Sequence, residues 1–241
     1  MTKEWFETWF DTRYYHTLYG HRDENEARQF IDALLSFLKP SEDARFLDVA
    51  CGKGRHAKQI NTSGFDLTGI DLSVNSIALA NQFASDTLRF IVQDIREDMG
   101  SNKYDYALNL FTSFGYFENT DQHISALKNI HRALKPQGIF VFDYLNVDQV
   151  NLEGASKQRV EIEDIQFEIR KSIQYKQIIK QIAVTEKGST RHFQERVMAF
   201  SKAELEYMLG SAGFAITKVC GDYNLSAYNK NAPRVIIIAK K

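Results

Sequence analysis

The sequence has little of what marks several large classes of protein. It contains two cysteines and three prolines, carries a net charge of −1, and has no apolar run of the roughly 18 residues that a transmembrane helix needs. Two cysteines give neither a disulfide framework nor a metal-binding spacing, and a near-neutral charge gives no electrostatic case for nucleic acid. The N-terminus, MTKEWFETWF, lacks the pattern of a signal peptide. We therefore expect a cytoplasmic protein with buried thiols at Cys51 and Cys220 and no nucleic-acid or membrane partner.

Composition otherwise indicates an ordinary globular protein. Hydrophobic residues make up 44% of the chain and charged residues 25%, which is typical of a folded domain. With 241 residues the chain can bury a sizeable core as one domain with an insertion.

One stretch, RFLDVACGKGRHA at residues 45–57, organises the rest of the chain. Its apolar run is typical of a buried parallel strand, and a helical pattern follows Gly52 and Gly54. Glycines let the backbone approach a ligand closely, and a helix N-terminus favours anionic or polar groups. Because α/β folds bind ligands at the carboxyl ends of their strands, we expect the binding site here.

Three aspartates lie near the ends of expected strands. Asp48, Asp71 and Asp94 are evenly spaced, 23 positions apart, which is about one strand-helix unit. The three carboxylates should therefore fall on the same edge of one sheet. The spacing Gly52-x-Gly54-x-x-Ala57 also satisfies the dinucleotide-binding fingerprint, so an NAD-dependent oxidoreductase remains open.

The remaining pattern predicts an α/β chain with one interruption. A change to period-2 alternation at residues 147–200 predicts an antiparallel insertion of three or four strands. Outside it, we expect helices at 24–38, 74–84, 121–134 and 202–211, and strands at 104–110, 139–144, 216–220 and 235–239.

The motif D-V-A-C-G-x-G-R-H-A, with acids after the second and third strands, resembles the class I S-adenosylmethionine (SAM)-dependent methyltransferases, from about Tyr15 to the C-terminus. The resemblance implies a Rossmann-like, seven-stranded, mostly parallel sheet with helices on both faces and an antiparallel last strand. Residues 1–146 and 201–241 would form this domain with an N-terminal helical lid. The 147–200 insertion resembles the inserted sheet of amino-sugar N-methyltransferases, which caps the substrate and often mediates homodimerisation; a stabilising decoration is the alternative.

The resemblance assigns the parts of SAM to residues of this chain. Asp71 would accept from the ribose hydroxyls, and Asp94 from the adenine amino group. Asp48 would reach the ammonium group, directly or through water, or would only organise the turn. The family's first motif glycine is Ala50 here, which matters only if that position needs a positive φ. The other cofactor-binding residues we expect in this region are Gly52, Gly54, Leu72, Ile95 and Phe111.

The N-terminal segment is aromatic-rich. Its pattern Tyr15-x-x-x-Tyr19-x-x-Arg22 resembles the first segment of small-molecule methyltransferases. The resemblance implies that Tyr15 and Arg22 hold the SAM carboxylate, which a guanidinium suits. The segment could instead be a packing flap over the sheet.

Methyl transfer is an in-line displacement with a neutral leaving group, so alignment and exclusion of water can supply much of the rate. If the acceptor must lose a proton, Tyr116 is the preferred base and His16 the second candidate, although a tyrosine there is often a pocket wall. The remaining histidines, among them His56, are expected to be solvated or to cap helices. No oxygen-ligand cluster for a metal stands out.

The sequence therefore predicts a SAM-dependent methyltransferase acting on nitrogen or oxygen of a small molecule. The tetrapeptide [DN]PPY and the Pro-Cys pair of nucleobase methyltransferases are absent. Besides the oxidoreductase, a non-catalytic SAM-binding module and an RNA or protein methyltransferase remain as alternatives.

Overall fold

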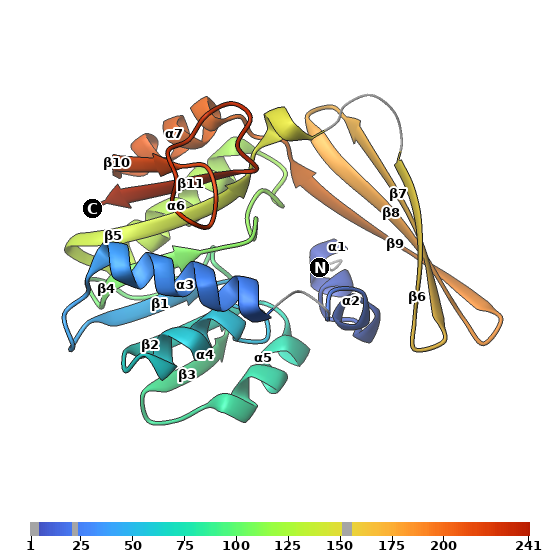
Figure 1. Ribbon diagram of the computed structural model, residues 1–241, viewed down its shortest axis with the longest axis horizontal. Helices are drawn as coiled ribbons and strands as arrows, with labels where there is room; N and C mark the ends of the chain where they lie inside the picture. Colours follow the sequence, from blue (N-terminus) through green and yellow to red (C-terminus); the bar gives the residue numbers. More distant parts are fainter. Residues whose placement is uncertain (1–4, 21–23, 151–155) are drawn as a thin grey trace. The chain divides into compact units, whose positions relative to one another are not determined.

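The computed structural model describes residues 5–20, 24–150 and 156–241. The chain divides into two compact units (Figure 1). The larger unit comprises residues 23–149 and 201–241, and the smaller unit comprises residues 1–22 and 150–200.

A seven-stranded sheet forms the centre of the larger unit, with the strand order β10-β11-β5-β4-β1-β2-β3. Neighbouring strands from β3 to β5 are parallel, and β11 is antiparallel to both β5 and β10. This confirms the expected Rossmann-like sheet. The strands are β1 (Arg45–Val49), β2 (Asp66–Asp71), β3 (Leu88–Val92), β4 (Tyr104–Asn109), β5 (Leu134–Leu145), β10 (Ala215–Cys220) and β11 (Arg234–Lys240).

Helices cover both faces of this sheet (Figure 1). The helices α3, α4 and α5 pack on the face that carries Phe46 and Leu108, while α6 and α7 lie on the face that carries Phe140 and Phe142. The helices are α3 (Glu24–Leu38), α4 (Arg55–Thr62), α5 (Val74–Ala80), α6 (Thr120–Ala133) and α7 (Lys202–Ser211), with short 3-10 turns η1 (Asn81–Phe83) and η2 (Val147–Gln149).

The bounds of two elements differ from the sequence prediction. The helix expected to run from residue 74 to 84 ends at Ala80 and continues as a 3-10 turn. Strand β5 begins at Leu134 rather than at residue 139, because Leu134 pairs with Tyr104 before the register shifts.

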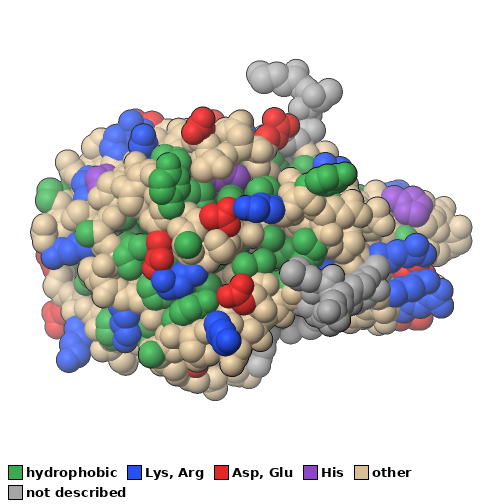
Figure 2. Space-filling view, turned by 90° about the horizontal axis from the view of Figure 1, so that it is seen from above, with side chains coloured by type: hydrophobic (Ala, Val, Ile, Leu, Met, Phe, Trp, Pro, Cys, Tyr) green, Lys and Arg blue, Asp and Glu red, His purple; other side chains and the backbone are tan. Residues whose placement is uncertain are grey.

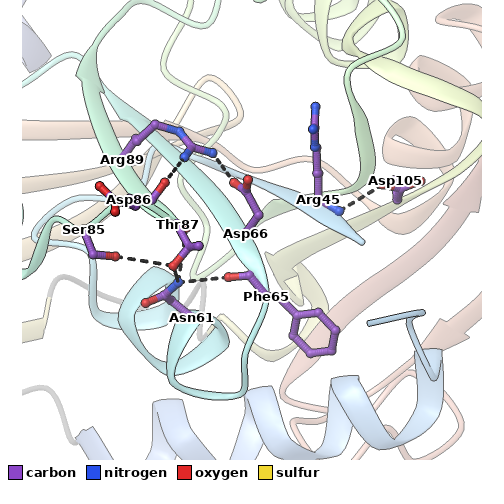
Figure 3. A network of polar contacts seen from close by, with 9 residues as sticks. All are labelled: Arg45, Asn61, Phe65, Asp66, Ser85, Asp86, Thr87, Arg89 and Asp105. Carbon is purple, nitrogen blue, oxygen red and sulfur yellow. Dashed lines mark hydrogen bonds and ion pairs between the residues drawn. The ribbon is translucent and has the colours of Figure 1, made fainter. Parts of the chain in front are cut away.

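The amino edge of the sheet is held by polar contacts between surface side chains (Figure 3). Arg89 of β3 pairs with Asp66 of β2, and the amide of Asn61 donates to the main-chain oxygens of Phe65 and Thr87. These contacts tie β2, β3 and α4 together at the edge opposite the expected site.

The smaller unit is a four-stranded antiparallel sheet with two short helices. Its strands, in the order β6-β7-β8-β9, are β6 (Ser156–Ile162), β7 (Ile165–Gln174), β8 (Gln177–Glu186) and β9 (Ser189–Met198). Two-residue loops at 163–164, 175–176 and 187–188 join them, and both residues of each loop have positive φ, as type I′ turns require. The insertion therefore has the larger of the two expected strand numbers.

The N-terminal helices α1 (Trp5–Trp9) and α2 (Arg13–Leu18) pack on one face of the four-stranded sheet. Trp9 is 1% exposed, and its indole nitrogen donates to Glu195 of β9 at 2.8 Å. Tyr19 donates to the same carboxylate at 2.7 Å, and Lys180 of β8 pairs with it at 2.9 Å. The aromatic segment thus forms a core with the insertion. None of the helices described in either unit is both long enough and apolar enough to cross a membrane.

Candidate active site

The turn after β1 is built from residues in the left-handed conformation. Ala50, Gly52 and Gly54 have φ values of 59°, 57° and 77°. At Gly54 a Cβ atom would lie 2.6 Å from the Phe90 ring, so packing also requires glycine there. At Gly52 a Cβ atom would meet nothing within 4 Å, so the space above this residue is open to a ligand. Position 50 does need a positive φ, so the alanine that stands here in place of the family's glycine does matter.

The carboxylate of Asp71 joins the glycine turn to the end of β2. Its Oδ2 accepts the backbone N–H of Gly52 at 2.8 Å, and its Oδ1 accepts that of Ser73 at 2.8 Å. A carboxylate has about four acceptor positions, more than these two backbone bonds use. Two such acceptors side by side match a vicinal diol such as that of ribose.

Asp48 is buried directly behind the turn. It is 1% exposed, and burial followed by repulsion from Asp71 raises its pKa to about 7, against a hydrogen bond from the Ala57 backbone and the charge of Arg55. The Ala57 contact supports the turn-organising role. Its Oδ2 has no hydrogen-bond partner among the described residues. A buried acceptor of this kind is costly unless a donor reaches it, and a ligand ammonium or a bridging water would supply one.

Asp94 is engaged by a residue that sequence reasoning missed. Arg96 donates to its carboxylate from the backbone at 2.8 Å, from Nε at 3.0 and 3.1 Å, and from Nη2 at 2.6 Å. The guanidinium also lies over the Phe117 ring, 5.1 Å from its centroid. The predicted role of Asp94 toward adenine therefore competes with an ion pair, for which the sequence D-I-R was an available signal.

The loop after β4 is held in an unusual conformation. Phe111 and Thr112 both have positive φ, 58° and 61°. The backbone N–H of Phe111 donates to Asp143 Oδ2 at 2.7 Å. The hydroxyl of Tyr116 donates to the Thr112 carbonyl oxygen at 2.8 Å and so braces the loop. Its role as a base stays a prediction.

Ring contacts connect this loop to the glycine turn. Phe111 stacks on His56 at a centroid distance of 4.9 Å and on Tyr223 at 5.0 Å, and the Arg55 guanidinium lies 4.7 Å from its centroid. His56 is only 8% exposed, so the expectation that it is solvated was wrong, while a capping rather than catalytic role stays a prediction. Tyr223 lies far along the chain, in the segment between β10 and β11, and no sequence signal pointed to it.

The remaining predicted residues have separate locations. Leu72 and Ile95 are half-buried beside Asp71 and Asp94. Tyr15 and His16 lie in α2 of the smaller unit, where the Tyr15 ring contacts those of Trp9, Phe10 and Tyr19. Arg22 lies outside the described residues. Their predicted roles in cofactor binding and catalysis stay predictions.

Fold and site together define a class. An antiparallel β11 between β5 and β10, a left-handed turn after β1 and a carboxylate at the end of β2 are the layout of a class I SAM-dependent methyltransferase. The open space above Gly52, the paired acceptors of Asp71 and the unpartnered oxygen of Asp48 fit that cofactor.

The chain belongs to the methyltransferase-domain family, whose model matches residues 19–219. YqeM of Bacillus subtilis (strain 168), named a methyltransferase, is 33% identical over 132 residues, which are 54% of this chain and 51% of YqeM. The match thus spans about half the length of that relative. The dTDP-3-amino-3,4,6-trideoxy-alpha-D-glucopyranose N,N-dimethyltransferase of Streptomyces venezuelae is 23% identical over 204 residues, 79% of this chain and 83% of that protein.

A solved structure extends the likeness to almost the whole chain. SAM-bound CalS10, an amino pentose methyltransferase from Micromonospora echinaspora, matches 95% of this chain and 96% of its own with a TM-score of 0.70 and 20% identity. At that identity the likeness shows the fold alone. The comparisons give no support to the oxidoreductase, the non-catalytic module or the RNA or protein methyltransferase.

Proposed function

We propose that this protein transfers a methyl group from SAM to an amino nitrogen of a small molecule, with amino sugars as the first acceptor class to test. The observation that carries the proposal is the open space above Gly52, whose backbone N–H is bound by the Asp71 carboxylate. The buried Asp48 oxygen, which has no hydrogen-bond partner among the described residues, supports it. The names of the sugar-modifying relatives support the acceptor class.

SAM supplies an electrophilic methyl group on a sulfonium that leaves as a neutral thioether. The backbone of the glycine turn would lie against the methionine part, Asp71 would hold the ribose, and Asp48 would face the ammonium. The acceptor amine must present its lone pair, and it loses a proton after transfer. The proton of the Tyr116 hydroxyl is engaged in a hydrogen bond to the Thr112 oxygen. An amine acceptor needs no strong base, whereas an alcohol does, so this arrangement suits an amine better.

The charge pattern agrees with a small acceptor. On the face drawn in Figure 2, basic side chains of the larger unit are interspersed with acidic ones. A polyanionic acceptor such as RNA would instead favour a continuous basic rim.

Calorimetric titration of the purified protein with SAM, S-adenosylhomocysteine and NAD tests the cofactor. We expect SAM and S-adenosylhomocysteine to bind and NAD not to bind. Methyl transfer is then measured as formation of S-adenosylhomocysteine with a panel of amino sugars and their hydroxyl analogues. Turnover of the hydroxyl analogues alone would contradict the amine, and binding of NAD alone would contradict the function.

We also propose that the protein works as a cytoplasmic homodimer, paired through the outer face of the four-stranded sheet. The other face is covered by α1 and α2. Side chains of both signs line a hollow on the proposed face, with Arg170 and Glu168 among them. Both cysteines are buried and unbridged, as a reducing compartment favours.

Light scattering tests the dimer. Arg170→Glu should give a monomer. It places a second carboxylate beside Glu168 on the proposed face of each copy, and two such like-charged faces repel each other. Lys240→Glu on β11 is the control and should leave the mass unchanged. A monomeric wild-type protein would remove the proposal.

A further inference from the structure

Two consecutive non-glycine residues with positive φ form the turn after β4. Phe111 and Thr112 are both in the left-handed region, which ordinary side chains rarely adopt. Such strain persists only where the surroundings hold it in place, and it concentrates at functional sites. The structure shows which residue holds this turn.

Asp143, at the mouth of β5, binds both backbone N–H groups of the turn. Its Oδ2 accepts from Phe111 at 2.7 Å, and its main-chain oxygen accepts from Thr112 at 3.1 Å. Asp143 is 0% exposed, so water cannot reach these two N–H groups in its place unless the fold opens. A buried carboxylate that accepts backbone N–H groups forms strong, well-oriented hydrogen bonds.

Asp143 is itself fixed by two partners from the end of the chain. Arg234 Nε donates to its Oδ1 at 2.8 Å, and the Tyr223 hydroxyl lies 3.3 Å from its Oδ2. Arg234 Nη2 also donates to Thr112 Oγ1 at 2.9 Å. Burial alone would lower the pKa of Arg234, but the interactions with Asp143, together with Tyr223 and Glu26, outweigh it and the pKa is raised. The Asp143–Arg234 ion pair therefore binds the turn at its backbone and at the Thr112 side chain.

The conformation of residues 111–112 sets the position of the Phe111 ring against the start of α4. His56 and Arg55, which contact that ring, are the first residues of α4, directly after Gly54. A change in the turn would thus shift the contacts at the start of α4, where the backbone approaches the ligand.

We propose that Asp143 is a positioning residue of the cofactor site, a role that rests on the proposed function. Its buried carboxylate is engaged by Phe111, Arg234 and Tyr223. It holds residues 111–112 in the left-handed conformation, and through the Phe111 ring it fixes the start of α4 beside Gly54.

Asp143→Asn tests this role. An amide has one oxygen, so it cannot accept from both Arg234 and Phe111, and its NH₂ group would face a donor. By calorimetry we expect S-adenosylhomocysteine to bind about tenfold more weakly, as for one lost charge-assisted hydrogen bond. Hydrogen exchange at the amides of residues 111 and 112 should become faster in the protein without ligand.

A rescue variant separates positioning from general damage. Glycine adopts a positive φ without strain, so Thr112→Gly added to Asp143→Asn should recover most of the affinity. Tyr223→Phe, which removes one hydrogen bond and keeps the ring, should weaken binding slightly and serves if Asp143→Asn does not fold. The matched control is Asp105→Asn, which breaks the ion pair with Lys135 near the amino end of β4 and should leave affinity unchanged.

The outcomes are distinct. If the wild-type protein binds no S-adenosylhomocysteine, the proposed function fails and the inference fails with it. If the wild type binds but Asp143→Asn and Tyr223→Phe bind equally well, the inference alone is overturned. Weaker binding without rescue by Thr112→Gly would also overturn it, because the effect would not pass through the turn.

Discussion

The Oδ2 atom of Asp71 lies 2.8 Å from the backbone nitrogen of Gly52. This hydrogen bond joins the end of β2 to the turn after β1, two segments that are apart in the chain and adjacent in the sheet. The same carboxylate that is expected to bind ribose therefore also shapes the turn beneath the rest of the cofactor. Removing it should affect both.

Asp71→Ala should weaken SAM binding by about 1.5–3 kcal/mol, the range for hydrogen bonds to a charged group. Calorimetric titration measures the loss. Asp66→Ala is the matched control, since it removes an aspartate from the other end of the same strand, where the partner is Arg89 (Figure 3). Unaltered affinity in Asp71→Ala, or an equal loss in the control, would contradict the assignment of the site.

The stability of the protein without ligand should depend on pH through Asp48. Its pKa rises from 3.8 to about 7 in the folded protein, because burial and then Asp71 disfavour the charge. Between pH 3.8 and about 7 the folded state binds a proton at Asp48 that the unfolded state does not. The stabilisation from protonated Asp48 is therefore full below pH 3.8 and is lost as pH rises through about 7. Asp48→Asn lacks the titration.

Thermal melts between pH 5 and 8 measure the effect. The melting temperature of Asp48→Asn relative to the wild type should rise across this window as the wild type loses the contribution. A constant difference would show that Asp48 does not titrate there. His131→Gln, which changes another group whose pKa is lowered mainly by burial, checks that the trend is specific to Asp48.

Ala50→Gly should stabilise the fold. Ala50 has a φ of 59°, a conformation that costs an alanine about 1–2 kcal/mol and a glycine little. Glycine also loses more freedom on folding, so we expect a net gain of about 1 kcal/mol by denaturant unfolding. Ala78→Gly, at an exposed site in α5, should instead cost about 1 kcal/mol. Destabilisation by Ala50→Gly would mean that the methyl group contributes packing that outweighs the strain.

Glu195→Ala should loosen the N-terminal helices. The substitution removes the acceptor of the buried Trp9 indole and the partner of Lys180. Leaving a buried donor unpaired costs about 1–3 kcal/mol. Tryptophan fluorescence is a suitable readout, since the chain has only two tryptophans, Trp5 and Trp9. Glu161→Ala, exposed on β6, is the control, and equal unfolding curves for the two variants would contradict the prediction.

Much of the fold could be predicted because its local signals agree. Helix α7 spans Lys202–Ser211 as expected, and the capping box of Ser201 and Glu204 explains where it starts. The Lys187-Gly188 loop turns the chain between β8 and β9. Equal spacing predicted that Asp48 and Asp71 meet at one edge, and the turn geometry between them agrees. The capping box and the two-residue loop depend only on residues that are neighbours in the sequence, so their patterns can be recognised before the fold is known.

The sequence by itself determined the α/β class, the glycine turn and the family resemblance, because each rests on short-range pattern. Only the tertiary structure decided that His56 is buried against Phe111 and that Asp143 and Arg234 hold the turn after β4. Asp143 and Arg234 are 91 positions apart. Their pairing follows from the antiparallel register of β5 and β11, which no local pattern specifies. A long-range ion pair becomes visible only when the sheet has brought its two strands together.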